Sequence, residues 1–262
     1  MDLHFTTQVL STFPEPAFYN KNRSEVPDLL GPMVFPKGLT LSDKEEKPFA
    51  FTFVLTDVNR VKQYAAALIV YELMDPQQLK TMFQQRRAST RRDSLVGPDA
   101  LQRQEEVINE VRVVYAPRAL VILSHYPFHY LFLRFLEQIY HTSLSLSPLP
   151  IERYIANFML EIPLPPQGRI EVSFSMPQAQ MQISRPPRNE LPMVDFSYRP
   201  LFAYMSIDNI ITIFNCLCQE MSICICSSNM ALLTPVQEAL QSFLFPFVWQ
   251  GCYVPVLPLD ML

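Results

Sequence analysis

The stretch FTFVLTDVNRVKQYAAALIVYEL, Phe51–Leu73, decides how the first part of the chain folds. Together with the preceding Phe49, its first half places large apolar side chains at every second position, the period of a strand with one buried face. A polar turn at Asp57–Arg60 follows, and a second apolar run, Tyr64–Tyr71, returns along the first. The stretch therefore predicts a β-hairpin, and Pro76 predicts the start of a short helix after it.

A polar, strongly charged segment, QQRRASTRRDSLVGPDALQRQE, occupies residues 84–105 and contains few large apolar groups. This composition predicts an exposed insert, which we bound at residues 84–110. Ser89 and Ser94 each lie three residues after the start of an Arg pair, an arrangement that suits kinases that prefer basic substrates. Phosphate there would add about −1.5 to −2 charge per site. A charged loop that only aids solubility explains the same residues equally well.

The middle of the chain combines apolar runs with amphipathic patterns. Residues 119–124, ALVILS, are apolar almost throughout, as in a strand buried on both faces. A helix is expected to begin at Pro127, with its apolar face formed by residues between Phe128 and Ile139. The further expected elements are the linker 143–150, the helix Ile151–Met159, the half-exposed strand 170–176, the proline-rich loop 177–200 and a helix capped by Ser206.

The back half alternates short apolar runs with helices. Thr234 and Pro235 predict the start of a helix, with Gln237 closing a capping box. The runs ICIC at 223–226 and CYVPV at 252–256 flank that helix, and the order strand, helix, strand predicts a βαβ unit. We therefore expect a parallel sheet in the back half. The single tryptophan, Trp249, precedes the expected strand 252–256, and we expect its side chain to anchor the back half of the chain, the second lobe.

Composition and missing motifs exclude several classes of protein. Among 262 residues, 49% are hydrophobic and 18% are charged, and the net charge of −4 lacks the basic surplus of a duplex nucleic-acid binder. With only five glycines, the chain has no phosphate-binding glycine-rich loop, nucleophile elbow or zinc-protease motif. Residues 239–259 are uncharged over about the length of a membrane span, but three prolines interrupt them, so a buried helix followed by a strand is expected.

Two sets of residues have spacings that invite a metal-site interpretation. His125 and His129 are four apart at a predicted helix start, yet a closed zinc site needs four ligands and no acidic or thiol partner lies nearby in the sequence. The cysteines form two pairs with one intervening residue, whereas zinc knuckles prefer two to four. We therefore expect ordinary histidines, buried cysteine thiols and no metal. The cysteines are Cys216, Cys218, Cys224, Cys226 and Cys252.

Six long motifs then carry a family resemblance. They are FPKGLTL (35–41), FTFVLTDVNRVKQYAAALIVYEL (51–73), YAPRALVILSHYPFHYLFLRFLEQIY (115–140), LPIERYIANFMLEIPLPPQGR (149–169), ELPMVDFSYRPLF (190–202) and FPFVWQGCYVPVLPLDML (245–262). In this order they resemble the upstream and core segments of the DENN domain, over about residues 30–262. The chain departs from the family pattern at Asn59 and Ala65, where glycine is common, and at Gly251, where many relatives have histidine.

The resemblance implies an α/β fold with two lobes. The first is longin-like, an antiparallel sheet flanked by helices, and the C-terminal α/β lobe contains a parallel sheet. The family continues with a further strand and helices, so we expect the second lobe to be incomplete at Leu262 and to self-associate through an exposed apolar patch. The implied segments are an extension at 1–29, the upstream DENN segment at 30–83, the insert at 84–110, the completion of the longin-like lobe at 111–146 and the core DENN lobe at 147–262.

The resemblance also implies a function, that of a guanine nucleotide exchange factor for a Rab-type small GTPase in membrane trafficking. The GTPase supplies the nucleotide and Mg²⁺, so no cofactor and no covalent enzyme chemistry are expected. A GTPase-binding scaffold without exchange activity is the alternative. We expect a cytoplasmic protein, peripheral to vesicle or endosomal membranes through its partners. The residues expected to contact the GTPase are Ser124, Tyr126, Glu152, Tyr154 and Asn157, although a helix-capping and seating role explains Ser124 and Tyr126 as well.

Overall fold

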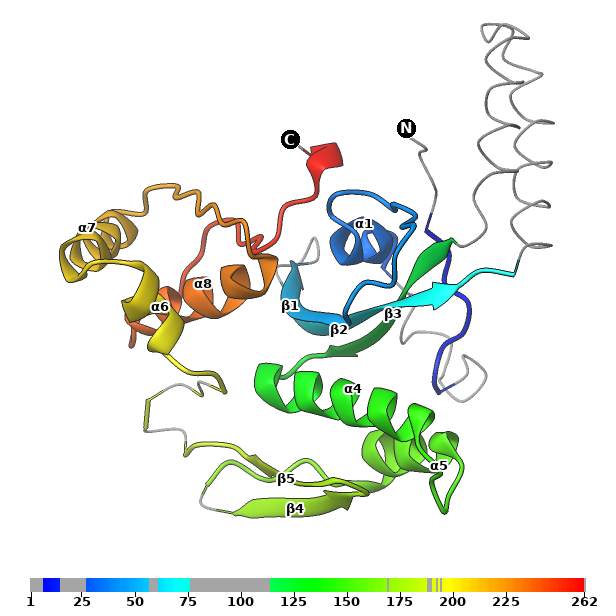
Figure 1. Ribbon diagram of the computed structural model, residues 1–262. Coiled ribbons are helices and arrows are strands. Elements are labelled where there is room, and N and C mark those ends of the chain that lie inside the picture. Colours follow the sequence, from blue (N-terminus) through cyan, green and yellow to red (C-terminus); the bar gives the residue numbers. More distant parts are fainter. Residues whose placement is uncertain are drawn as a thin grey trace, which may run out of the picture. The chain divides into compact units, whose positions relative to one another are not determined.

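The computed structural model describes residues 7–14, 27–56, 61–75, 114–168, 170–187, 190–191, 193 and 195–261. Figure 1 labels the elements along the chain. The chain divides into two compact units. The first contains residues 1–6, 38–49 and 69–119, and the second contains residues 7–37, 50–68 and 120–262. The predicted turn at Asp57–Arg60, the helix expected at Pro76 and the charged insert at 84–110 lie outside the described residues.

The hairpin predicted from Phe51–Leu73 is confirmed as the start of a three-stranded antiparallel sheet. Its strands are β1 (Phe49–Thr56), β2 (Lys62–Leu73) and β3 (Tyr115–Ser124), in the order β1-β2-β3. The central position of β2 explains why its residues 65–70 are all buried. The expectation that residues 119–124 are buried on both faces is wrong. They belong to the outer strand β3 of the described sheet, where Leu120 is exposed.

The first unit is held by backbone pairing and by a surface ion pair. Ser42 and Tyr115 exchange backbone hydrogen bonds of 3.0 and 2.8 Å, and the Met74 N–H donates to the Val114 carbonyl at 2.8 Å. The Arg118 guanidinium lies 2.9 Å from the Glu72 carboxylate. Both charged side chains are about half exposed, so the pair adds little to stability, and the backbone pairing dominates.

The second unit contains most of the helices and a second hairpin. The helix expected from Pro127 is α4 (His129–Leu144), and the next is α5 (Ile151–Ala156), which continues as a π-helix, η2 (Asn157–Glu161). Strands β4 (Glu171–Met176) and β5 (Ala179–Ser184) form an antiparallel pair. The prediction of an uninterrupted loop over residues 177–200 is therefore wrong. Residues 179–184 alternate Met181 and Ile183, which are buried, with exposed polar side chains.

An aromatic cluster centred on Phe158 joins these elements. The Phe158 ring stacks on Phe135 of α4, with ring centroids 3.9 Å apart and an interplanar angle of 19°. It also meets Phe132 edge-on at 6.3 Å and Phe174 of β4 at 5.6 Å. One π-helix residue thus packs against both a helix and a strand. Aromatic pairs at these separations contribute beyond the area that they bury.

The remaining described helices also belong to the second unit, and three of them form a separate apolar cluster. They are α1 (Leu30–Val34), α6 (Arg199–Tyr204), α7 (Ile207–Cys218), η3 (Met230–Leu232), α8 (Leu233–Ser242) and η4 (Leu259–Met261). Helix α7 begins as predicted, because the Ser206 hydroxyl accepts a hydrogen bond from the Asn209 N–H. The buried members of the cluster come from α6, α7 and α8, and they are Leu201, Ile210, Val236, Ala239 and Leu240.

The expected parallel sheet is absent from the described residues, whose sheets are antiparallel. Residues 223–226 and 252–256 form no strand there, although both runs are apolar. Their apolar groups pack individually instead. Ile225 lies against the α6–α8 cluster, and Tyr253 is buried with its hydroxyl donating to Glu238 at 2.6 Å. Residues 252–256 thus bury side chains without pairing their backbone in a sheet, whereas within 223–226 only Ile225 is even half-buried.

The start of α8 also differs from the predicted capping box. Thr234 lies inside the helix, and its hydroxyl donates to the backbone carbonyl of Thr52 in β1 at 2.5 Å. The Gln237 amide donates to the Pro255 carbonyl at 2.9 Å rather than to the helix start. Both side chains form long-range hydrogen bonds, because buried polar groups need partners wherever the fold provides them.

Trp249 does not occupy the buried strand entry expected for it. The side chain is half-buried, and its indole N–H donates to the Cys252 carbonyl at 3.1 Å. A Cβ at Gly251 would lie 2.8 Å from the Trp249 ring, so the ring covers a backbone without a side chain. The tryptophan therefore closes a local turn, and the aliphatic α6–α8 cluster lies elsewhere.

Replacing Phe158 with alanine should destabilise the second unit by about 3 kcal/mol, because the stacked and edge-on aromatic contacts disappear together. Thermal and denaturant unfolding would measure the change. Met159→Ala is the matched control, since Met159 is the next residue of the same π-helix and is 37% exposed. Its effect should stay within about 0.5 kcal/mol. Equal effects of the two substitutions would contradict a core role for Phe158.

Candidate functional site

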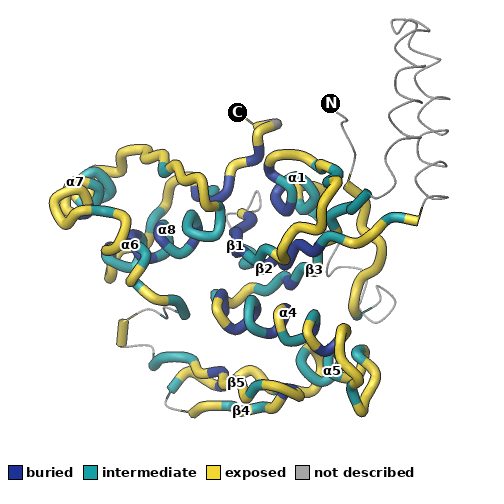
Figure 2. Tube along the Cα trace, viewed as in Figure 1, coloured by how far each residue is buried: buried dark blue, intermediate teal, exposed yellow. Residues whose placement is uncertain are grey.

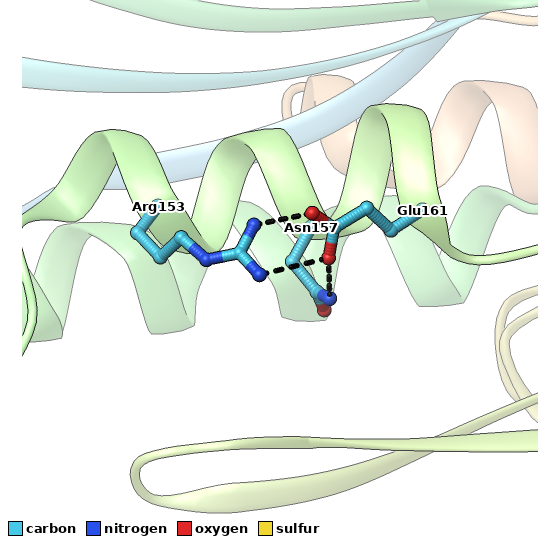
Figure 3. Close-up of polar contacts among 3 residues, drawn as sticks. All are labelled: Arg153, Asn157 and Glu161. Carbon is cyan, nitrogen blue, oxygen red and sulfur yellow. Dashed lines mark hydrogen bonds and ion pairs between the residues drawn. The ribbon is translucent and has the colours of Figure 1, made fainter.

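The surface of α5 and η2 carries a polar cluster built by helical spacing. Arg153 and Glu161 are eight residues apart, a rise of about 12 Å along a helix that two long side chains can span. The Arg153 guanidinium donates two hydrogen bonds to the Glu161 carboxylate, at 2.5 and 3.0 Å. The Asn157 amide donates to the same carboxylate at 2.8 Å, so one carboxylate gathers both donors (Figure 3).

The electrostatics of this cluster are those of an exposed ion pair. The hydrogen bond and the charge of Glu161 raise the pKa of Arg153, and the hydrogen bonds from Arg153 and Asn157 lower the pKa of Glu161. Both side chains are about half exposed, and solvent screens such pairs strongly. The cluster therefore orders polar groups on the surface more than it stabilises the fold.

Three of the five predicted contact residues lie on this helical segment. Glu152 is exposed, and among the described residues its carboxylate has no hydrogen-bond or ion-pair partner. The Tyr154 hydroxyl lies 3.0 Å from the Ser147 hydroxyl, which ties the helix to the preceding linker. Asn157 takes part in the ion-pair cluster. The free carboxylate of Glu152 is thus the charge that remains available to a partner.

The other two predicted residues lie before α4 and have structural contacts. The Ser124 hydroxyl accepts a hydrogen bond from the Tyr126 N–H at 3.1 Å. The Arg185 guanidinium lies over the Tyr126 ring at 4.9 Å and donates to the Pro165 carbonyl at 3.4 Å. Tyr126 remains 37% exposed. A seated aromatic ring with one free face can serve both the local turn and a partner.

Aromatic contacts connect these two groups of predicted residues. Tyr126 lies 6.0 Å from Phe128, which lies 6.0 Å from Phe132, which in turn meets Phe158 of the π-helix at 6.3 Å. The connection holds within the second unit, and it runs through packed rings rather than through polar contacts. Tyr126 is therefore connected to the α5–η2 surface by a chain of packed aromatic rings, and no polar contact joins the two among the described residues.

Four contributing residues escaped the sequence prediction. Arg153 and Glu161 pair across a π-helix, and Arg185 reaches Tyr126 from β5's far end. Asp195 accepts a hydrogen bond from the Leu131 N–H at 3.2 Å and so caps α4 from a distant segment. The opposite charges of Arg153 and Glu161 within the motif 149–169 could have predicted their ion pair. No local sequence pattern predicts the contacts of Arg185 and Asp195, because their partners lie far away in the sequence.

The two histidines at the start of α4 have different environments. His125 is exposed, whereas His129 is buried between the rings of Tyr64 and Phe196, at centroid distances of 5.4 and 6.0 Å. Neither ring nitrogen of His129 has a hydrogen-bond partner among the described residues. Burial lowers its pKa to about 4, so the imidazole is neutral near pH 7.

The expectation of buried thiols is wrong, because none of the five cysteines is fully buried. Cys218, Cys224, Cys226 and Cys252 are exposed, and Cys216 is partly buried. They follow the surfaces of α7 and of the irregular segments, which the expected parallel sheet would have covered. Within the described ranges, no group of three or more His, Cys, Asp or Glu side chains is placed to hold a metal ion.

Two further predictions concern the chain's surroundings. Ser89 and Ser94 lie outside the described residues, so their phosphorylation stays a prediction. In the part of the chain that the structure describes, no helix combines the length and apolar character needed to cross a bilayer. The uncharged run 239–259 divides between the end of α8 and irregular chain.

Comparison with known proteins identifies similar sequences. The family described as DENN (AEX-3) domain matches residues 115–262, and the uDENN domain matches residues 7–70. The DENN domain and WD repeat-containing protein SCD1 of Arabidopsis thaliana is 31% identical over 158 residues, 58% of this chain and 13% of that protein. The DENN domain-containing protein C297.05 of Schizosaccharomyces pombe is 34% identical over 115 residues, 44% of this chain and 12% of that protein.

The burial of His129 predicts a pH-dependent stability. Its pKa is about 4 in the folded protein and 6.5 when unperturbed, so between these values the unfolded state binds more protons. The contribution of the neutral His129 to the free energy of unfolding should be fully present above pH 6.5. It should be lost as the pH drops toward 4, by about 3 kcal/mol in total. Denaturant unfolding across this range should show a shallower decline for His129→Phe than for wild type. His141→Phe, at an exposed site in α4, should keep the wild-type profile. Identical profiles for wild type and His129→Phe would refute the assignment.

Proposed function

Because the chain belongs to the DENN (AEX-3) domain family, known as exchange factors for Rab GTPases, we propose that it binds a Rab-type small GTPase and promotes GDP release. The observation that carries the proposal is the DENN match over residues 115–262, more than half of the chain. The family resemblance drawn from the motifs is thereby confirmed. Members of this family are regulators of GTPases rather than catalytic enzymes.

Exchange of this kind needs a surface rather than a reactive group. A protein that binds the nucleotide-free GTPase more tightly than the GDP-bound form lowers the affinity for GDP by the same factor. The switch regions of a GTPase depend on the nucleotide and Mg²⁺ for their order, so contacts that hold them open favour release. The proposed role therefore requires side chains that present shape and charge to the partner.

The α5–η2 surface offers such side chains. Glu152, with its free carboxylate, directly precedes Arg153 in the sequence, and Arg153, Asn157 and Glu161 form the ordered cluster. Leu160 of the π-helix η2 is 60% exposed. Interfaces of this type combine an apolar centre with polar groups that fix the register. π-Helical segments occur frequently at functional sites, which supports this choice of surface.

We expect the chain to accelerate release of a fluorescent GDP analogue from at least one member of a panel of Rab GTPases. The acceleration should increase with the concentration of the chain, because release follows formation of the complex. Binding measured by interferometry, without acceleration for any Rab in the panel, would favour a scaffold that engages the GTPase without exchange. If the chain neither binds any Rab in the panel nor accelerates its nucleotide release, the proposal is refuted for this chain.

Charge reversal of Glu152 to lysine should weaken GTPase binding and reduce the rate of nucleotide release. The exposed carboxylate has no partner to lose among the described residues, so the melting temperature should stay within a few degrees of wild type. Glu137→Lys is the matched control, since Glu137 is an exposed carboxylate on α4. It should leave binding unchanged. A lowered melting temperature for Glu152→Lys would assign the residue a structural role instead.

The wider biology follows from the same proposal. We propose a cytoplasmic protein that reaches vesicle or endosomal membranes through its GTPase, with the upstream segment at 30–83 and the core segment at 147–262. Self-association through the back half stays part of the proposal, supported by the exposure of apolar residues there. The most exposed apolar residues in the described part of 147–262 are Leu191, Tyr204, Phe247 and Val248, at 71%, 72%, 79% and 71%. Figure 2 colours the exposed positions of the chain yellow.

A further inference from the structure

The segment between α7 and η3 places two thiols beside each other. The Sγ atoms of Cys224 and Cys226 are 3.9 Å apart, and both residues are exposed. Ile225, between them, is half-buried against the α6–α8 cluster. In an extended chain alternate residues share a face, so the inward anchor at Ile225 turns both thiols outward together.

The two sulfur atoms are already neighbours, and a local movement of the segment would bring them to disulfide distance. A disulfide has an S–S distance of about 2.05 Å, so the two sulfur atoms must approach by about 1.9 Å. Residues 221–227 have no regular secondary structure, so no ladder of backbone hydrogen bonds opposes a local bend. The Met221 N–H donates to the Cys216 carbonyl at 3.0 Å, which holds the start of the segment in place.

We propose that Cys224 and Cys226 form a redox modification site that closes to an intramolecular disulfide with a small-molecule disulfide as oxidant. One thiolate attacks the oxidant, forms a mixed disulfide and releases the first small thiolate. The second protein thiolate attacks the protein sulfur of that mixed disulfide, and the second small thiolate leaves. The two protons of the cysteines pass to these leaving groups, so one oxidant is reduced to two thiols as two cysteines are oxidised.

The chain contains its own control for this geometry. Cys216 and Cys218 have the same spacing but lie on helix α7, where residues two apart point to different sides. They cannot close without unwinding the helix. Spacing alone is therefore insufficient, and the irregular backbone around Cys224 and Cys226 makes the difference.

Two consequences follow from the environment of the pair. A hydrogen bond with Cys226, and the charge of that residue, raise the pKa of the Cys224 thiol, so closure should accelerate as the pH rises into the alkaline range. A bend at Ile225 also disturbs its contact with the α6–α8 cluster, so the oxidised chain should melt at a lower temperature than the reduced chain.

Mass spectrometry can isolate the pair, because cleavage after glutamate separates the cysteines into three peptides. Leu191–Glu220 contains Cys216 and Cys218, Met221–Glu238 contains only Cys224 and Cys226, and Ala239–Leu262 contains Cys252. The full chain would be equilibrated with mixtures of reduced and oxidised glutathione, alkylated in acid-quenched, denatured form, and digested. Dithiothreitol treatment before alkylation provides the reduced reference.

We expect Met221–Glu238 to become lighter by two hydrogens and to carry no alkyl group, while Leu191–Glu220 gains no internal disulfide. Cys224→Ser should instead trap one glutathione on Cys226, because the resolving thiol is missing. The proposal is overturned if wild-type Met221–Glu238 keeps two alkyl groups in the most oxidising mixture, stops at a stable mixed disulfide, or cross-links to another peptide. Because the wild-type chain gives these outcomes, a misfolded variant would leave the test intact. An unchanged melting temperature on oxidation would refute the coupling through Ile225.

Discussion

The stacking of Phe158 on Phe135 is the contact on which the candidate surface depends. The two rings lie 3.9 Å apart, and Phe158 also packs against Phe132 and against Phe174 of β4. This packing orients the π-helix η2 with its aromatic residue inward. Glu161 is consequently exposed and Asn157 is half-buried, and both Asn157 and Arg153 can reach the Glu161 carboxylate.

Near the starts of α4 and α8, polar groups that often take part in local capping are hydrogen-bonded to residues far away in the sequence. Asp195 supplies the carboxylate at the start of α4, and Thr234 of α8 donates to the Thr52 carbonyl of β1. Each contact satisfies a polar group and joins segments far apart in sequence. Cooperative folding of the second unit follows, since a helix whose cap lies on another segment is stable only when that segment is in place.

The polar groups singled out in the candidate site lie on the surface of the described chain, and the less exposed titratable groups have packing roles. No histidine, cysteine or acidic cluster of the described residues forms a metal centre. The buried His129 and the half-buried Glu238 belong to the packing of α4 and α8. Membership of the DENN family is consistent with such a protein, because members of that family are regulators rather than catalytic enzymes. Cys224 and Cys226, in the irregular segment after α7, add a chemical property of their own.

Sequence alone determined the hairpin, the helices α4, α5 and α7, and the family, and it supplied a set of candidate residues that stay predictions. Each of these rests on a local period, a cap or a long ordered motif, and local patterns survive without knowledge of the fold. Sequence could not decide whether 223–226 and 252–256 form the expected parallel sheet, because an apolar run becomes a strand only where a partner strand pairs with it. In the described chain these runs form no strand, and Ile225 and Tyr253 pack through their side chains instead. Strand β5 was missed because prolines on either side of it obscured a short alternation. Tertiary structure also decided that Cys224 and Cys226 face solvent and that Arg185 covers Tyr126, since burial and distant contacts depend on which segments meet.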